Sequence, residues 1–344
     1  QDAVNDFSVN IPLVSYDTSY KELLVETIDK LIEYPEIDGA TARQALSTFL
    51  NWPKDEITLG NGATDLIYLV ARAFKFQVAM VLNPTFSEYQ SALEQAGTKV
   101  VNHVMKIGNM DKTLTFEVDA HELARHAVDN ACRSLFICNP NNPTGQFFST
   151  TFLESFLIRV DKDFVLIIDE SFIEFRSREA HHKKMCELVK RYNILVIRSM
   201  TKTYSVPGLR MGYAFGNANL MQTLNRYRDP WALNRFALES IPYFLKRKME
   251  LAALQDHSIK ALEEMRDALM QISGLDVSHS EANFLLIRVQ GTDPVTWHER
   301  MIDGRYYLRT CMDFIGLGPE YFRVVVKDKA SNQKLIEAIR ENMK

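Results

Sequence analysis

Short apolar runs that alternate with longer helical segments constrain the fold of this chain more than any other feature. Five runs stand at 78–82, 134–138, 164–168, 194–197 and 212–215. Their residues are apolar at consecutive positions, which is typical of strands buried on both faces of a helix-covered sheet. Segments 64–74, 88–96, 150–160 and 183–192 can form the helices between them. The pattern predicts an α/β fold with a mostly parallel sheet.

The pattern changes after Pro230. A helical stretch at 236–272 precedes strand-like segments at 282–289, 306–311 and 321–326, and a last helical segment follows at 332–343. This order is typical of a smaller α+β unit, and 344 residues suit one large domain with a smaller companion. We therefore predict an N-terminal segment 1–33 that packs on both lobes, a large domain 34–235 and a small domain 236–344.

Composition narrows the expected partners and location. A net charge of -4 with 24% charged residues does not favour a nucleic-acid surface, so a small-molecule partner is expected. The four cysteines lack the spacing of a disulfide framework or a zinc site, which predicts no metal and suits the reducing cytoplasm. Neither a signal sequence within residues 1–20 nor a run of 18 apolar residues is present, so no membrane association is expected.

Polar residues follow the apolar runs directly. These clusters are 83–85, 139–145, 169–170 and 199–202. Ligands of open α/β sheets bind beyond the carboxyl ends of the strands, so the four clusters are expected to face one site.

The segment 199–213 is the most informative of these. Lys202 stands among hydroxyl residues, and Arg210 follows eight positions later. Together they offer an amine for imine formation and donors for a phosphate dianion, a combination that suits pyridoxal phosphate. The alternative is that Lys202 is a surface lysine in a turn.

Three further stretches fit the same interpretation. Asp169 ends a buried run, where its carboxylate needs a cation such as a pyridinium nitrogen, although it could instead cap a helix. Segment 139–145 has two prolines and a glycine that would hold an amide rigidly, or would simply form a turn. Segment 60–65 opens a helix with small residues and suits a phosphate. It is neither a P-loop nor a dinucleotide fingerprint, because Asp65 replaces the third glycine.

Together these stretches resemble the class I and II aminotransferase family, the fold type I enzymes that use pyridoxal phosphate (PLP), from Tyr34-Pro35 to Arg323. The resemblance implies that Lys202 carries the cofactor as a Schiff base, that Asp169 pairs with its pyridinium nitrogen and that Asn142 donates to its phenolic oxygen. Phosphate-binding positions are matched by Ala63, Thr64, Ser199, Thr201 and Arg210. Phe86 matches the aromatic residue that stacks on the ring. Tyr34 matches a tyrosine that reaches the phosphate from a neighbouring subunit, which implies a homodimer.

One position departs from the family pattern. Many relatives have tyrosine three residues after the aspartate, where it also donates to the phenolic oxygen, but this chain has Phe172. Asn142 is then the main donor, and the imine is expected to be more basic because the phenolate has fewer hydrogen bonds.

Within the family, the sequence resembles the branch that contains threonine-phosphate decarboxylase and histidinol-phosphate aminotransferase. Phe172, segment 230–234 and the tail around Arg309 and Arg323 are more similar to the decarboxylase. The two arginines could clamp a carboxylate and a phosphate, or form surface salt bridges. Asn10 matches a substrate contact, although Ile11-Pro12 replaces the usual Asn-Pro after it.

The resemblance therefore implies decarboxylation of an O-phospho-amino acid such as L-threonine-O-3-phosphate, in cobalamin biosynthesis. Histidinol-phosphate aminotransferase or a related aminotransferase is the alternative. The two reactions differ in which substrate bond stands perpendicular to the cofactor ring. A non-catalytic PLP-binding protein is a third possibility, but regulators of that kind carry a DNA-binding domain, and no basic N-terminal extension is seen. Threonine phosphate and serine phosphate differ by one methyl group, and no single residue of the sequence indicates which of the two is the substrate.

Overall fold

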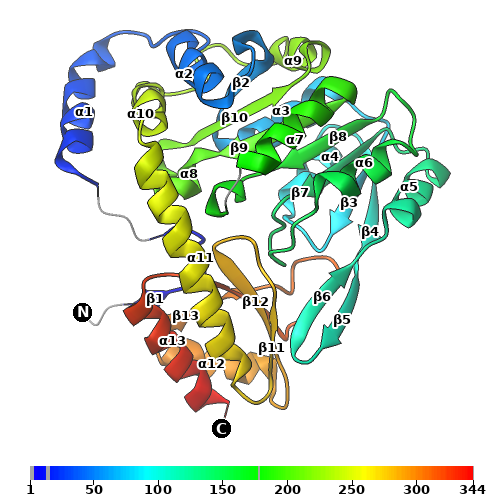
Figure 1. The fold of residues 1–344 in the computed structure, drawn as a ribbon, viewed down its shortest axis with the longest axis vertical. Coiled ribbons are helices and arrows are strands. Elements are labelled where there is room, and N and C mark those ends of the chain that lie inside the picture. The colour runs from blue at the N-terminus through cyan, green and yellow to red at the C-terminus, as the bar shows by residue number, and fades with distance from the viewer. Residues whose placement is uncertain (1–3, 13–15, 177–178, 344) are drawn as a thin grey trace.

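The computed structural model describes residues 4–12, 16–176 and 179–343. The predicted N-terminal segment 1–33 thus includes residues 1–3 and 13–15, which lie outside the described residues. Figure 1 shows two sheets, one above the other, with the long helix α11 running beside both.

The larger sheet has seven strands in the order β2-β10-β9-β8-β7-β3-β4. The five strands β9, β8, β7, β3 and β4 pair in parallel. At one edge, β10 pairs antiparallel with β9 on one side and with β2 on the other. This confirms the predicted α/β class and the mostly parallel sheet. The strands are β2 (Ile57–Asn61), β3 (Val78–Asn83), β4 (Lys99–Val104), β7 (Ser134–Cys138), β8 (Val165–Asp169), β9 (Ile194–Ser199) and β10 (Met211–Gly216).

Alternate residues of each central strand enter different hydrophobic cores. In β8, Leu166 and Ile168 belong to one core and Ile167 belongs to the other. Helices cover both faces, and this double burial is the reason for the consecutive apolar residues. One face is covered by α3 (Gly62–Phe74), α4 (Glu88–Gln95) and α9 (Ala218–Asn225). The other is covered by α2 (Ala40–Leu50), α5 (Ala120–Asp129), α6 (Thr150–Leu157), α7 (Glu179–Arg191) and α10 (Arg235–Leu245).

The second sheet has six strands in the order β14-β15-β12-β11-β6-β5, with a separate core against its helices. Its strands are β5 (Lys106–Met110), β6 (Thr113–Glu117), β11 (Leu275–Ser278), β12 (Phe284–Val289), β14 (Arg309–Thr310) and β15 (Tyr321–Val325). Its helices are α11 (Lys248–Met270), α12 (Pro294–Asp303) and α13 (Lys329–Asn342). Strands β5 and β6 come from the range 34–235, so two distant stretches of chain build this sheet. The predicted domain boundaries themselves stay a prediction.

Two expected elements are divided. The helix predicted at 236–272 is two helices, because Arg247 between α10 and α11 has φ −96° and ψ 55°, which is outside the helical region. The strand predicted at 306–311 is also interrupted. Its first part, β13 (Tyr306–Tyr307), pairs with β1 (Asn5–Asp6), whereas β14 pairs with β15. Two different partners therefore break one expected strand.

The described part of the N-terminal segment contacts both regions. While β1 pairs beside the second sheet, α1 (Thr18–Asp29) packs on α10, where the Tyr20 hydroxyl is 3.0 Å from Ser240 Oγ. The short helices are η1 (Lys30–Ile32), η2 (Lys54–Glu56), η3 (Ile173–Phe175), α8 (Met200–Thr203) and η4 (Pro207–Leu209).

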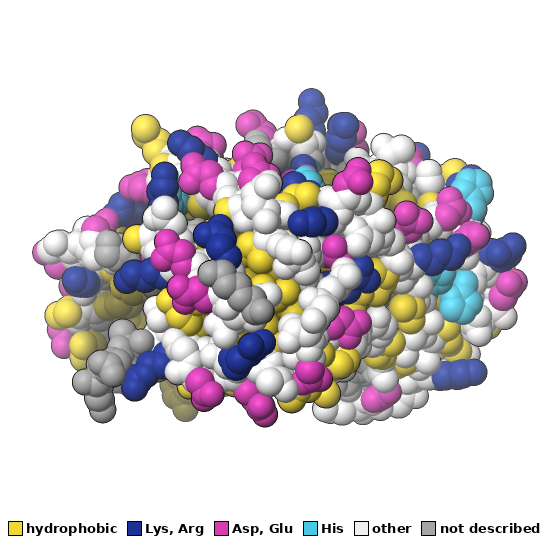
Figure 2. All heavy atoms as spheres, turned by 90° about the horizontal axis from the view of Figure 1, so that it is seen from below, with side chains coloured by type: hydrophobic (Ala, Val, Ile, Leu, Met, Phe, Trp, Pro, Cys, Tyr) yellow, Lys and Arg dark blue, Asp and Glu magenta, His cyan; other side chains and the backbone are white. Residues whose placement is uncertain are grey.

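The surface carries both charge signs. Figure 2, which looks onto the lower end of Figure 1, shows acidic and basic side chains interspersed over that face. Among the described residues, no helix has both the length and the apolar character needed to cross a membrane. The same residues contain no group of three or more His, Cys, Asp or Glu side chains placed to hold a metal ion.

Candidate active site

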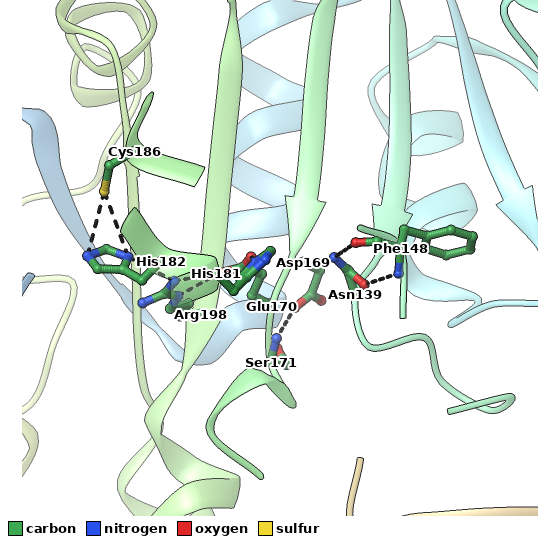
Figure 3. Close-up of polar contacts among 9 residues, drawn as sticks. All are labelled: Asn139, Phe148, Asp169, Glu170, Ser171, His181, His182, Cys186 and Arg198. Carbon is green, nitrogen blue, oxygen red and sulfur yellow. Dashed lines mark hydrogen bonds and ion pairs between the residues drawn. The ribbon is translucent and has the colours of Figure 1, made fainter. Parts of the chain in front are cut away.

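The carboxyl ends of β7, β8 and β9 meet at one edge of the larger sheet. Cys138 at the end of β7 pairs in register with Asp169 at the end of β8, and Asp169 pairs with Ile197 of β9. The backbone N–H of Asn139 donates to the Asp169 carbonyl at 2.8 Å. Figure 3 shows these strand ends side by side. Parallel pairing therefore brings the predicted polar clusters together.

Asp169 is buried, with 4% of its surface exposed. Its Oδ1 accepts the backbone N–H of Ser171, and its Oδ2 accepts the Tyr89 hydroxyl, both at 2.8 Å. The next helical turn begins only at Ile173, so Asp169 does not cap a helix. Both oxygens are held, and each retains a further lone pair for a cationic ligand.

Lys202 lies on α8, directly after β9. Burial lowers the pKa of its amine, whereas the Asp169 carboxylate acts in the opposite direction. A lowered pKa increases the fraction of neutral, nucleophilic amine. The Lys202 Nζ lies 4.6 Å from the centroid of the Phe172 ring, and that ring meets Phe284 edge to face at 5.0 Å. Phe172 is thus next to the amine, at the position where many relatives have tyrosine.

The start of α3 and the side chain of Arg210 form an anion-binding corner. Gly62 has φ +82°, and a Cβ there would lie 2.7 Å from Arg210 Nη2, so the guanidinium lies against the first residue of the helix. The N-terminal N–H groups of a helix, here those of Ala63 and Thr64, lack helical partners. Asn61 makes no side-chain cap at this end. A phosphate is the ligand that such a corner favours.

Ser199 and Thr201 border the same corner. Their hydroxyl oxygens are 2.7 Å apart and both residues are buried. Ser199 pairs in register with Gly212 of β10, and a Cβ on Gly212 would lie 2.7 Å from the Ala63 nitrogen. The hydroxyls therefore lie one strand away from the start of α3.

Asn142 is held by an arginine from the second sheet. Arg323 Nη1 donates to Asn142 Oδ1 at 2.6 Å, and its Nη2 donates to the Ser8 carbonyl at 2.8 Å. Burial lowers the pKa of Arg323 to about 10, which still leaves the side chain charged at neutral pH. With its oxygen committed to Arg323, the amide nitrogen of Asn142 remains to donate to a ligand.

Arg309 and Asn10 lie near Arg323. Arg309 is its direct cross-strand partner, and its guanidinium donates to Asp313 at 2.5 Å and to the Thr310 carbonyl at 2.8 Å. Asn10 is buried, and its Oδ1 has no hydrogen-bond partner among the described residues. The register thus places both arginines side by side on one face of the second sheet, and Arg323 reaches Asn142 beyond the end of β7.

Phe86 and Tyr34 differ in position. Phe86 is partly buried and meets Tyr89 edge to face at 5.8 Å, and Tyr89 in turn contacts Asp169. Tyr34 is 82% exposed and packs on Trp231, with ring centroids 5.0 Å apart. Among the described residues, the ring contact of Tyr34 is with Trp231 and not with the site, and its action across a subunit interface stays a prediction.

A buried charge network, shown in Figure 3, was missed by the sequence reasoning. Glu170 Oε2 accepts from Arg198 Nε at 2.8 Å and from its Nη2 at 2.7 Å, and Oε1 lies 2.6 Å from His181 Nε2. Arg198 Nη2 also lies 3.3 Å from His182 Nδ1. The signal for this network was Arg198 itself, a charge that ends the apolar run 194–197 and therefore requires a buried partner.

The sequence profile of the family described as "Aminotransferase class I and II" matches residues 4–339. This chain belongs to that family. The family is PLP-dependent, and its membership confirms the prediction that the protein is an enzyme.

Two curated relatives illustrate the branch. Threonine-phosphate decarboxylase from Salmonella typhimurium is 31% identical over 344 residues, which covers 98% of this chain and 91% of the relative. Histidinol-phosphate aminotransferase 1 from Mannheimia succiniciproducens is 28% identical and covers 94% and 86%, respectively. The two names are those of the predicted activity and its alternative.

Solved structures give the same pair of activities. The histidinol-phosphate aminotransferase from Clostridium acetobutylicum superposes with a TM-score of 0.88 at 26% identity, and the L-threonine-O-3-phosphate decarboxylase from Porphyromonas gingivalis with 0.85 at 25%. Each pair covers 98% of both chains. The histidinol-phosphate aminotransferase from Sinorhizobium meliloti, crystallised with pyridoxal-5'-phosphate, shares the fold with a TM-score of 0.84 at 17% identity.

Proposed function

We propose that this enzyme uses PLP to decarboxylate an O-phosphorylated amino acid, with L-threonine-O-3-phosphate as the expected substrate. The observation that carries the proposal is the pairing of a buried carboxylate, Asp169, with a buried amine, Lys202, beside an arginine-lined helix start. Burial lowers the pKa of the Lys202 amine, on which the charges of Asp169, Arg323 and Arg210 also act, and we infer that these groups line one space. Within the family this space is the cofactor site.

The residues present fit the cofactor at each end. Asp169 would hold the protonated ring nitrogen, and the corner formed by Arg210 and the start of α3 would hold the phosphate. Asn142 would donate to the phenolic oxygen through its amide nitrogen. When bound, PLP condenses with an amine and takes up the electrons of a bond broken at the α-carbon.

The chain's own residues would contact the ring nitrogen, transfer a proton and exclude water. Asp169 would face the ring nitrogen with a carboxylate whose two oxygens are held in place by hydrogen bonds from Tyr89 and Ser171. Lys202, with a lowered pKa, can hold or release a proton at Nζ beside the reacting carbon. The Phe172 ring lies against the Lys202 amine and packs on Phe284, so it would exclude water on that side of Lys202.

Substrate recognition would depend on the second sheet. Arg323 Nε is buried without a hydrogen-bond partner among the described residues, and so is Asn10 Oδ1, two positions after Ser8, whose carbonyl accepts from Arg323. Such buried groups are costly unless a ligand completes them. Arg309, which lies opposite Arg323, can leave its partly exposed contact with Asp313 to join a dianionic phosphate.

The overall change conserves atoms and charge. The bond between the α-carbon and the carboxylate breaks, carbon dioxide leaves, and one proton adds to the α-carbon to give 1-aminopropan-2-yl phosphate. Anchoring of the substrate phosphate by Arg323 and Arg309 would hold the substrate with its α-carboxylate oriented for departure, and bound PLP would accept the electrons of the broken bond. We propose that this amino alcohol phosphate is supplied to cobalamin biosynthesis.

Histidinol-phosphate aminotransferase is the second candidate, because relatives with that name cover nearly as much of the chain. The purified protein would be incubated with threonine phosphate, serine phosphate, unphosphorylated threonine, and histidinol phosphate plus 2-oxoglutarate. We expect carbon dioxide from threonine phosphate, little turnover without the phosphate, and loss of both turnover and affinity in Arg323→Ala. Rapid glutamate formation from histidinol phosphate without carbon dioxide from threonine phosphate would replace the assignment. Cofactor binding without any turnover would favour a non-catalytic protein.

We also propose a homodimer that completes the phosphate site through Tyr34. Exposed apolar side chains gather on the end of α1, on η1 and on the following segment, namely Val25, Ile28, Leu31, Ile32, Tyr34 and Ile37. A patch of this kind is typical of a protein interface. Sedimentation analysis should give a dimer, and Tyr34→Phe should weaken PLP binding. A monomer with unchanged affinity for PLP would contradict this part.

The unpaired cysteines among the described residues support a reducing, cytoplasmic location.

A further inference from the structure

We propose that Tyr89 is a positioning residue that fixes the Asp169 carboxylate in the orientation needed to contact the cofactor ring nitrogen. The inference rests on the proposed PLP site and adds a residue that the family pattern in the sequence did not assign. Tyr89 lies on α4, eighty positions before Asp169, and 1% of its surface is exposed.

The carboxylate is held from two sides. Tyr89 donates its hydroxyl hydrogen to Oδ2 at 2.8 Å, and the Ser171 backbone N–H donates to Oδ1 at the same distance. Rotation of the carboxylate about its Cβ–Cγ bond would break both hydrogen bonds. The Ser171 N–H is local and would persist in any variant that keeps this turn. Among the described residues, Tyr89 is the side chain that donates a hydrogen bond to Asp169.

Tyr89 is itself rigid and remains a donor. Its ring packs between Phe86 at 5.8 Å and Phe136 at 6.1 Å, which restricts movement of the hydroxyl. Burial, together with the nearby Asp169 charge, raises the pKa of Tyr89 well above its ordinary value. The phenol thus stays protonated at working pH and remains the donor in its hydrogen bond to Asp169.

The consequence is a division of roles. Tyr89 does not hold the cofactor; it determines where the negative charge of Asp169 is directed. Loss of the hydroxyl should therefore weaken only those interactions that pass through Asp169. A hydrogen bond to a charged group corresponds to roughly tenfold or more in an equilibrium.

The experiment measures binding rather than turnover. Protein stripped of cofactor would be titrated with PLP and with 1-deaza-PLP, in which carbon replaces the ring nitrogen, by following quenching of protein fluorescence. The ratio of the two affinities reports the contact between Asp169 and the ring nitrogen. We expect Tyr89→Phe to reduce that ratio roughly tenfold while the affinity for 1-deaza-PLP changes little.

A double-mutant cycle identifies the route of the effect. In the Asp169→Asn background, adding Tyr89→Phe should leave the ratio unchanged. Tyr20→Phe is the matched control, because it also removes the hydroxyl of a buried tyrosine, here one that lies 3.0 Å from Ser240 Oγ. It should keep the wild-type ratio.

Each result decides a separate question. Failure of the wild-type protein to bind PLP would refute the proposed function. Normal PLP binding with a Tyr89→Phe ratio within twofold of wild type would overturn the role of Tyr89 alone, as would an equal effect in the Asp169→Asn background. If Tyr89→Phe does not fold, 3-fluorotyrosine at position 89 serves instead, since it is a stronger donor of the same shape. The ratio should then rise, and a fall would contradict the inference.

Discussion

Substitution of Glu170 by glutamine tests the buried charge network next to Asp169. The carboxylate is fully buried, and its oxygens contact Arg198, which is 1% exposed, and His181. Glutamine keeps the shape of the side chain but removes its charge. Arg198 would then remain charged in the interior without its main partner. Removing one partner of a buried ion pair typically costs about 3 to 5 kcal/mol of stability.

A second estimate comes from the acid titration of Glu170. Burial alone would raise its pKa, but Arg198 and His181 outweigh burial and lower the pKa from 4.5 to about 2. At about 1.4 kcal/mol per pH unit, this difference corresponds to about 3 kcal/mol. Because the folded-state pKa lies below the unfolded one, the stabilisation is present above pH 4.5 and is lost as the pH falls towards 2.

The assay is urea denaturation of the PLP-saturated wild type and of Glu170→Gln, at pH 7 and in steps down to pH 3. We expect the variant to be about 3 kcal/mol less stable at pH 7, and the difference to shrink below pH 4.5. Glu154→Gln is the matched control, since Glu154 pairs with Arg191 at 2.6 Å on the surface, and its loss should cost under about 1 kcal/mol. Equal, small effects in both variants, or a difference that does not change with pH, would refute the reasoning.

Three further predictions concern the proposed cofactor site. Lys202→Ala should abolish turnover and the yellow colour of a reducible cofactor linkage; a wild type that stays colourless on adding PLP would contradict this. Asp169→Asn should retain the cofactor through its phosphate contacts but lose most activity, so near-normal turnover would show that Asp169 is only structural. Phe172→Tyr should move the pH titration of the visible absorption band to lower pH, because a new donor reaches the phenolic oxygen. An unchanged titration would show that position 172 does not approach the cofactor.

The sequence by itself determined the larger sheet and the residues at its edge. Apolar runs such as 134–138 and 194–197 became β7 and β9 almost unchanged, because double burial leaves a local mark on every residue of a strand. Asp169 and Lys202 could be named as candidates for the same reason, since Asp169 directly follows the run 164–168 and Lys202 stands shortly after the run 194–197. Edge strand β4 left no such mark, because most of its residues are only half buried.

Only the tertiary structure decided which distant groups meet. Asn142 and Arg323 are 181 positions apart, and Tyr89 reaches Asp169 across 80 positions. Neither contact has a sequence spacing that could predict it. Strands β5 and β6 likewise belong to the second sheet, where β6 pairs with β11. This pairing joins two distant stretches of the chain, so it depends on the path of the whole chain. Local sequence patterns determine whether a segment is buried and whether it forms a helix or a strand. A hydrogen bond between side chains that are remote in the sequence depends instead on how whole elements pack. The side-chain partner of Asp169 could therefore be found only in the folded chain.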